Sequence, residues 1–279
     1  MSKFISSPRA IAVAALLSTL ALSAQVAQAA PVQIKVTVEN PVAANGIAFA
    51  PLRVGFGNGS FDAFNLGGVA TAPIISVAEG GSGVDWFPAF AAADPGATLG
   101  TVVPSPPGPL VPGGMGMTTF TLDPALSRFF TFASMLVPSN DLFIGNDDPM
   151  EYDLLDAAGN LQITSITVRA NEIWDAGSEV FDPTAAAFVA GGTNSLRTAQ
   201  NSVVAFNFAE LAAFNGMTTG AAYVLNSQLR GTDEVYRISF SVVAVPEPES
   251  YALMLAGLVG VAAVARRRRN VRSNTRSTV

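Results

Sequence analysis

The chain has 279 residues, of which 49% are hydrophobic and 13% charged, with 15 basic and 21 acidic side chains. Histidine and cysteine are both absent, which excludes a Ser-His-Asp triad, a cysteine nucleophile, zinc sites of the usual ligands, haem ligation by histidine, and disulfide bonds. The 25 glycines and 18 prolines are dispersed and favour many short strands joined by turns over long helices.

The first 29 residues have the pattern of a secretory signal peptide. Lys3 and Arg9 precede an apolar run at 10–22, and small residues lead up to a cleavage point after Ala29. The run is shorter than the ~20 residues that a membrane span needs, so a retained anchor is the less favoured alternative. We therefore expect signal peptidase to release a chain that begins at residue 30.

Residues 30–244 have the pattern of one antiparallel all-β domain. The stretch VQIKVTV at 32–38 alternates apolar and polar residues with β-branched enrichment, as a half-buried strand does. Further strands are expected at 47–56, 117–122, 129–136, 161–169 and 235–243. We predict an antiparallel β-sandwich.

Three connecting segments carry weaker signals. DAAGN at 156–160 is expected to be a turn between two strands. The stretch 71–116 is the least regular, and its proline-rich part at 104–114 is expected to be a surface loop. FNFAELAAF at 206–214 could form one helix, although the spacing of its phenylalanines decides nothing.

Two segments concentrate carboxylates, and each follows an expected strand. The second segment is EIWDAGSE at 172–179, and the first holds six acids within sixteen residues: Asp141, Asp147, Asp148, Glu151, Asp153 and Asp156. In an extended strand, residues four apart are ~13 Å from each other, too far to share a ligand. Gly177 permits a chain reversal that would bring Asp175 and Glu179 to one centre, and Asp141 could join them.

Converged carboxylates favour calcium. Two unit charges ~4 Å apart repel by ~4 kcal/mol at an effective dielectric near 20, so such acids need a proton or a metal ion. Without histidine or cysteine the ligands are all oxygen, which selects calcium over the transition metals. The alternative is that these acids form an ordinary solvated surface.

A family resemblance covers roughly residues 32–191. FASMLVPSND at 132–141, followed by FIGNDDP and then by EIWDAGSE, resembles the spondin N-terminal domain. The resemblance implies a β-sandwich similar to calcium-dependent membrane-binding domains, with Asp141, Asp175 and Glu179 as metal ligands. The family pattern has aspartate at the position of Glu179 and an aromatic residue at that of Leu142. Trp174 is interpreted as a core residue under the loop.

The C-terminal segment 245–279 combines three features of a sorting signal. Pro246-Glu247-Pro248 precedes an uncharged apolar run at 250–265, and four arginines follow at 266–269. A helix of that length spans ~24 Å, less than the ~30 Å hydrocarbon core of a bilayer. We expect a short transmembrane helix that inserts transiently in the inner membrane, with the arginines on the cytoplasmic side.

These C-terminal features resemble the PEP-CTERM sorting signal of Gram-negative bacteria. The resemblance implies recognition by an exosortase-type transpeptidase that cuts near the motif. It also implies a location at the cell surface or in the extracellular matrix of a bacterium that produces exopolysaccharide. A plain single-span anchor is the alternative.

The charge of the exported part bears on its partners. Between residues 30 and 265 there are seven basic and 21 acidic residues, a net charge of −14. So acidic a surface argues against nucleic acid as a partner and favours a divalent cation.

The sequence therefore predicts a secreted, calcium-binding adhesion or binding module that contacts exopolysaccharide or a surface protein, and it predicts no enzymatic activity. A glycoside hydrolase that acts on matrix polysaccharide is the alternative, because such an enzyme needs only two suitably spaced carboxylates. A structural matrix protein with an incidental metal ion fits the same features.

Overall fold

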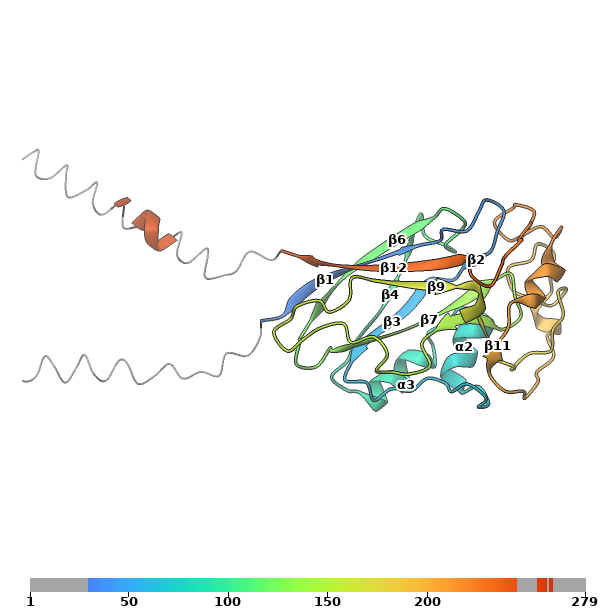
Figure 1. Ribbon diagram of the computed structural model, residues 1–279, viewed down its shortest axis with the longest axis horizontal. Coiled ribbons are helices and arrows are strands. Elements are labelled where there is room, and N and C mark those ends of the chain that lie inside the picture. The colour runs from blue at the N-terminus through green and yellow to red at the C-terminus, as the bar shows by residue number, and fades with distance from the viewer. Residues whose placement is uncertain (1–29, 245–254, 260, 263–279) are drawn as a thin grey trace, which may run out of the picture.

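The computed structural model describes residues 30–244, 255–259 and 261–262. Within 30–244, two antiparallel sheets pack face to face, which agrees with the predicted β-sandwich (Figure 1). The first sheet has the order β5-β6-β1-β12-β9. Its strands are β5 (Pro104–Ser105), β6 (Met115–Leu122), β1 (Val32–Glu39), β12 (Glu234–Val243) and β9 (Ser165–Arg169).

The second sheet has the order β11-β10-β8-β7-β3-β4, and a further strand, β2, pairs with β7. Its strands are β11 (Ala205–Phe206), β10 (Trp174–Asp175), β8 (Leu142–Gly145), β7 (Phe129–Val137), β3 (Leu52–Gly57), β4 (Thr98–Val102) and β2 (Ala48–Phe49). Three short 3-10 helices lie in the connections: η1 (Ala170–Glu172), η2 (Asn194–Leu196) and η3 (Ala209–Phe214).

Alternation along β1 produces the central strand of the first sheet. Ile34, Val36 and Val38 are fully buried, and the residues between them are only half-buried. The strand pairs along its whole length with β6 on one side and β12 on the other. Aromatic contacts then join the two sheets, with the ring centroids of Phe130 and Phe240 4.9 Å apart.

Two helices cover the outer face of the second sheet. They are α2 (Ala72–Gly80) and α3 (Trp86–Ala93). The sequence did not predict either helix, because 71–116 was expected to be the least regular stretch. Each helix is short and contributes two or three buried side chains, Trp86 and Phe90 in α3. So few apolar positions give a weak helical signal, and burial against the sheet supplies the stability instead.

Other expectations hold with adjusted bounds. The strand expected at 161–169 begins only at Ser165, and the strand expected at 47–56 is divided into β2 and β3. The turn at 156–160 is confirmed, because Asp156 Oδ1 accepts hydrogen bonds from the backbone N–H of Ala158 at 2.9 Å and of Asn160 at 2.8 Å. The helix considered at 206–214 is the 3-10 helix η3.

The expected cleavage point after residue 29 and most of the apolar run at 250–265 lie outside the described residues. Residues 255–259 and 261–262 are helical and exposed. Within the described part of the chain, no helix has both the length and the apolar character to cross a bilayer.

Candidate functional site

The two acidic segments meet at one end of the second sheet, as the sequence predicts. Asp141 immediately precedes β8 and Asp175 ends β10, and these strands are neighbours with Asp175 opposite Leu142. The Ala176 N–H also donates a 3.2 Å hydrogen bond to the carbonyl oxygen of Asp141. Strand pairing therefore places the two aspartates beside each other although they are distant in sequence.

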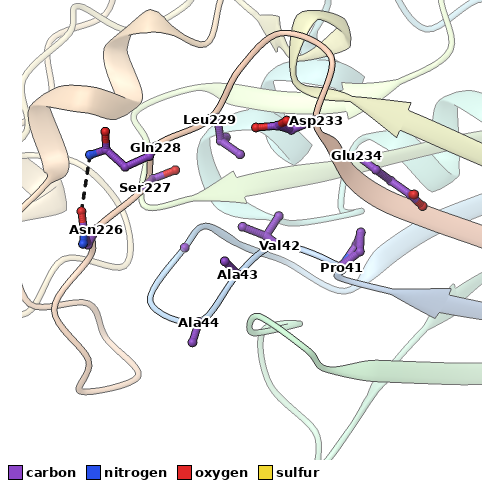
Figure 2. A pocket seen from close by; sticks show the side chains of 11 residues that line it. Pro41, Val42, Ala43, Ala44, Asn226, Ser227, Gln228, Leu229, Asp233 and Glu234 are labelled. Carbon is purple, nitrogen blue, oxygen red and sulfur yellow. Dashed lines mark hydrogen bonds between the residues drawn. The ribbon is translucent and has the colours of Figure 1, made fainter.

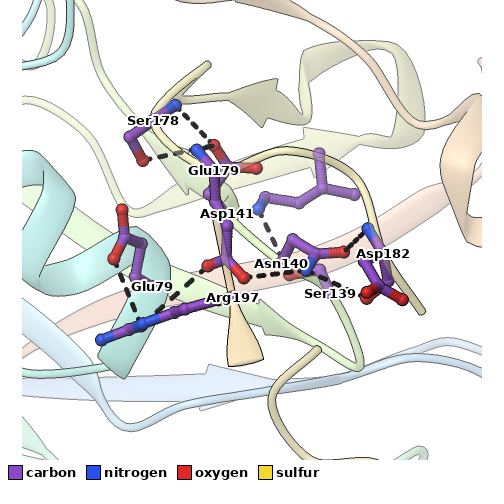
Figure 3. Close-up of polar contacts among 9 residues, drawn as sticks. Glu79, Ser139, Asn140, Asp141, Ser178, Glu179, Asp182 and Arg197 are labelled. Atoms are coloured by element: carbon purple, nitrogen blue, oxygen red, sulfur yellow. Dashed lines mark hydrogen bonds and ion pairs between the residues drawn. The ribbon is translucent and has the colours of Figure 1, made fainter. Parts of the chain in front are cut away.

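The Asp141 side chain is buried and holds the loop that follows β10. Its Oδ2 accepts hydrogen bonds from the backbone N–H of Ser178 at 2.7 Å, the Ser178 hydroxyl at 3.2 Å and the backbone N–H of Glu179 at 3.0 Å (Figure 3). Only 2% of the residue is exposed. Burial, and after it the Asp175 carboxylate, raises the pKa of Asp141 to about 6 against the effect of these hydrogen bonds. Among the described residues, Oδ1 of Asp141 takes part in no hydrogen bond.

The predicted reversal at Gly177 is present and is stabilised by Asp175. Gly177 has φ +63°, in the left-handed region that glycine tolerates best. Its N–H donates to Asp175 Oδ1 at 2.8 Å, while the Asn207 side-chain amide donates to Asp175 Oδ2 at 3.0 Å. Asp175 thus organises the turn from one carboxylate oxygen and the segment after β11 from the other.

Glu179, the third predicted ligand, has a different set of partners. Its Oε1 accepts a 2.9 Å hydrogen bond from the Asn140 side-chain amide, and its Oε2 lies 4.0 Å from a guanidinium nitrogen of Arg197 (Figure 3). Arg197 is closer to Glu79 of α2, at 3.2 Å. Only 3% of Glu179 is exposed and its Oε2 has no hydrogen-bond partner. Burial raises the pKa of Glu179 to about 7, and Glu79 and Asp141 add to the increase.

Glu210 joins the group and was not foreseen from the sequence. It lies in the first turn of η3, three residues after the Asn207 that bonds Asp175. Burial raises the pKa of Glu210 to about 7, and the negative charges of Asp175 and Asp141 add to the increase. Nothing in the sequence near Glu210 relates it to the other acids, because the fold alone brings η3 to β10.

The remaining acids of the two segments serve local structure. Asp153 forms an ion pair with Arg128 at 2.5 Å. Asp147 accepts a hydrogen bond from the Leu66 N–H at 3.3 Å. Glu172 accepts one from the Arg169 N–H at 2.6 Å at the start of η1.

Trp174 has the structural role expected of it. The residue is 6% exposed, and its indole N–H donates a 2.9 Å hydrogen bond to the carbonyl oxygen of Gly145. Its ring stacks on Phe206 with centroids 3.9 Å apart and packs edge-on against Phe64. Trp174 therefore anchors the strand that carries Asp175.

The acidic side chains have the chemistry that calcium needs, but their present arrangement does not form a complete calcium site. The acids at this end of the sheet offer only oxygen, which is what calcium takes. Asp141 also keeps one carboxylate oxygen free of hydrogen bonds among the described residues. However, within the described ranges no three acidic side chains are arranged to hold a metal ion. A bound ion would therefore need a rotated Glu179 or Glu210 side chain, or backbone carbonyls and water, to complete its shell.

Comparison with known proteins identifies the C-terminal segment. Residues 244–269 match the PEP-CTERM protein-sorting motif. No curated protein matches the chain. The resemblance to the spondin N-terminal domain is supported by no family match. The motif at 244–269 supports export of the protein and its sorting to the cell surface by an exosortase-type system of a Gram-negative bacterium.

Proposed function

We propose that the protein is an exported surface or matrix binding module whose loop end is stabilised by calcium. The observation that carries the proposal is that Asp141 and Asp175 lie beside each other on adjacent strands. Asp141 is buried and Asp175 is half-buried. Neither forms an ion pair among the described residues. Burial and, after it, the Asp175 carboxylate raise the pKa of Asp141, and a cation there would favour the ionised form of both acids.

In this proposal the chain's own residues have separate tasks. Asp141 would present Oδ1 to the ion, while its Oδ2 keeps the Ser178 and Glu179 amides in place. Asp175 would supply a second carboxylate from the neighbouring strand. The third acid would be Glu179, which the spondin resemblance indicates, or Glu210, whose pKa responds to both aspartates. Calcium supplies charge neutralisation when bound.

A calcium titration of the 30–244 fragment, which contains both sheets, tests the proposal by calorimetry. We expect binding to the parent and a loss of at least tenfold in affinity for Asp141→Asn and Asp175→Asn. Asp153→Asn is the matched control, because Asp153 is an aspartate of the same segment that pairs with Arg128. The calcium claim fails if the parent takes up no calcium, or if all three variants bind as the parent does.

A carboxylate-dependent glycoside hydrolase is the second candidate. The pKa values of about 6 for Asp141 and about 7 for Glu210 are in the range that a proton donor needs near neutral pH. Reducing-sugar release from the producing strain's own polysaccharide, measured with the parent and with Glu210→Gln, separates the two candidates. Release that depends on Glu210 would favour the enzyme, and absence of release would favour the binding module.

A further inference from the structure

A cavity of about 600 Å³ lies between the 3-10 helix η3 and the segment 227–230, which leads to β12. The residues that line it include Phe208, Leu211, Asn215, Gln228, Leu229 and Arg230. We call this space the Arg230 cavity, because Arg230 is the one charged residue among the described residues that line it. The volume falls in the range of small-ligand sites.

The guanidinium of Arg230 has no partner within 30–244. The other arginines of this range all have one, through an ion pair for Arg128, Arg197 and Arg237 and through hydrogen bonds for Arg53 and Arg169. Arg230 is also exposed. Its charge is therefore available to an anion that enters the cavity.

Two backbone N–H groups next to Arg230 are available as well. Within 30–244, the N–H groups of Gln228 and Leu229 donate no hydrogen bond. The N–H of Arg230 itself donates to Asp233 Oδ2 at 2.8 Å. A guanidinium and backbone N–H groups are the donors that form strong, charge-assisted hydrogen bonds with a carboxylate. The segment thus offers donors for an acidic group.

Asn215 holds the wall that carries these donors. Its Oδ1 accepts a hydrogen bond from the Ser227 N–H at 2.7 Å, and its Nδ2 donates to the Ser227 carbonyl at 3.1 Å. One residue earlier, the Asn226 N–H donates to the Asn45 carbonyl at 2.8 Å. Because the backbone is fixed before a ligand arrives, little conformational entropy is lost on binding.

The neighbouring cavity, of about 450 Å³, has the opposite charge. It lies between the same segment and the loop at 41–46, and Asp233 and Glu234 line it (Figure 2). Neither acid lines the Arg230 cavity. Gln228 lines both cavities, and its Nε2 donates to Asn226 Oδ1 at 3.4 Å. Its Oε1 takes part in no hydrogen bond among the described residues and can accept one from a ligand hydroxyl.

Phe208 adds an aromatic side chain beside these polar groups. Its Cζ would lie 3.9 Å from a side-chain carbon built on Gly231, the residue that follows Arg230. Phe208 is half-buried, so part of its apolar surface is open to a ligand. The cavity therefore combines donors for a carboxylate, an acceptor for a hydroxyl and an apolar surface.

We propose that the Arg230 cavity binds a carboxylated saccharide, a uronic acid unit of a polysaccharide. A sugar acid carries a carboxylate for Arg230 and the two N–H groups, hydroxyls for Gln228 Oε1, and an apolar C–H face for Phe208. An acidic peptide side chain carries only the first of these. No acid of the candidate calcium site lines the cavity, so this site is independent of the calcium proposal.

The test is a calorimetric titration of the full chain, purified in mild detergent, in a buffer that contains a calcium chelator. The ligands are trimers of glucuronic, galacturonic and mannuronic acid, each compared with the neutral trimer of the same sugar. Triglutamate and inorganic phosphate serve as anions without a sugar. At least one acidic trimer is expected to bind, at least tenfold more tightly than its neutral counterpart and than either of these anions.

Three variants assign the binding to the cavity. Arg230→Gln is expected to weaken binding of the acidic trimer at least tenfold, and Gln228→Ala about threefold. Arg128→Gln is the matched control, because it removes the charge of an exposed arginine outside the cavity and should bind as the parent does. The arginines at 266–269 are present in every variant, so a difference between variants reports the cavity.

Thermal unfolding of the same variants guards against a misleading loss of fold. Because Arg230 is exposed and its guanidinium has no partner within 30–244, Arg230→Gln is expected to unfold at the parent's temperature. The proposal is overturned if no acidic trimer binds at 5 mM, or if Arg230→Gln binds as tightly as Arg128→Gln. It is equally overturned if a neutral trimer, triglutamate or phosphate binds as tightly as the best acidic trimer.

Discussion

The carboxylate of Asp141 receives both the backbone N–H and the hydroxyl of Ser178, at 2.7 and 3.2 Å, so an acid in front of β8 fixes the loop that follows β10. This loop is also paired on its other side, where the Gln200 N–H donates to the Ser178 carbonyl at 2.8 Å. The acidic end of the second sheet is therefore held by hydrogen bonds before any ion binds, and its stability should respond to changes in these acids.

Replacing Asp141 by alanine should destabilise the domain by about 1–3 kcal/mol, because the buried N–H groups of Ser178 and Glu179 lose their acceptor. Urea unfolding followed by tryptophan fluorescence measures the loss. Asp153→Ala is the control, since its side chain is 40% exposed and an exposed ion pair contributes at most about 1 kcal/mol. Equal losses for the two variants would contradict the role assigned to Asp141.

Without calcium, stability should decrease as pH rises from 5 to 8. The pKa of Asp141 is raised to about 6, and those of Glu179 and Glu210 to about 7, so the folded state holds these protons more tightly than the unfolded chain does. This contribution is complete below the unfolded pKa values near 4 and is lost as pH passes through 6 to 7.

Urea midpoints at four pH values in a chelating buffer measure this trend. Glu179→Gln should flatten it, because glutamine cannot lose a proton. Added calcium should raise the midpoint most at pH 8, where the acids are ionised. A midpoint that increases steadily from pH 5 to 8 in the chelating buffer would contradict the assignment.

Gly177→Ala should lower the stability of the domain more than Gly191→Ala does. Both substitutions strain the backbone, but only the first adds a steric clash. A side-chain carbon at 177 would lie 2.8 Å from the carbonyl oxygen of Val203, whereas one at Gly191 would meet nothing within 4 Å. Both glycines have positive φ, at +63° and +76°. Each alanine should lose about 1–2 kcal/mol to the left-handed conformation. The excess for Gly177→Ala, seen as a lower melting temperature, reports the clash.

Trp174→Phe should destabilise the domain by about 1–3 kcal/mol, since the Gly145 carbonyl loses the indole N–H. Phe206→Leu should have the smaller effect, because Phe206 is 50% exposed. Differential scanning calorimetry compares them. A larger loss for Phe206→Leu would show that the stack, and not the hydrogen bond, fixes β10.

Glu247→Ala, in the matched sorting motif, should prevent processing of the exported chain. The intact mass of protein recovered from the membrane and from the medium measures the outcome. The variant is expected to stay in the membrane fraction with its C-terminal segment attached, while the parent appears shortened. Glu172→Ala, a substitution outside the motif, should be processed like the parent.

The strands in which buried and exposed residues alternate can be predicted from the sequence. The prediction is less accurate for elements whose formation depends on tertiary contacts. β1 and β12 follow their apolar patterns almost residue by residue. Helix α3 was missed because its stability comes from packing against the sheet.

The same division holds at the candidate site. The turn at Gly177 followed from glycine's conformational freedom, and strand order brought Asp141 to Asp175. The partners of Glu179 did not follow, because Arg197 reaches it from a separate loop. Helix η3 places Glu210 near Asp175 and Asp141, and no local sequence pattern indicates this proximity.

The pairing of Gln33 with Val243 has a consequence for how the domain is presented during sorting. The N-terminal and C-terminal residues of the domain therefore lie at the same end of the sandwich. Strand β12 begins with Glu234 at the opposite end and runs for ten residues, or about 33 Å. Figure 1 shows β11 and the loops around it at that opposite end of the sandwich. In a molecule held at its C-terminus by the sorting machinery, the carboxylates would thus lie at the end of the domain far from the point of attachment.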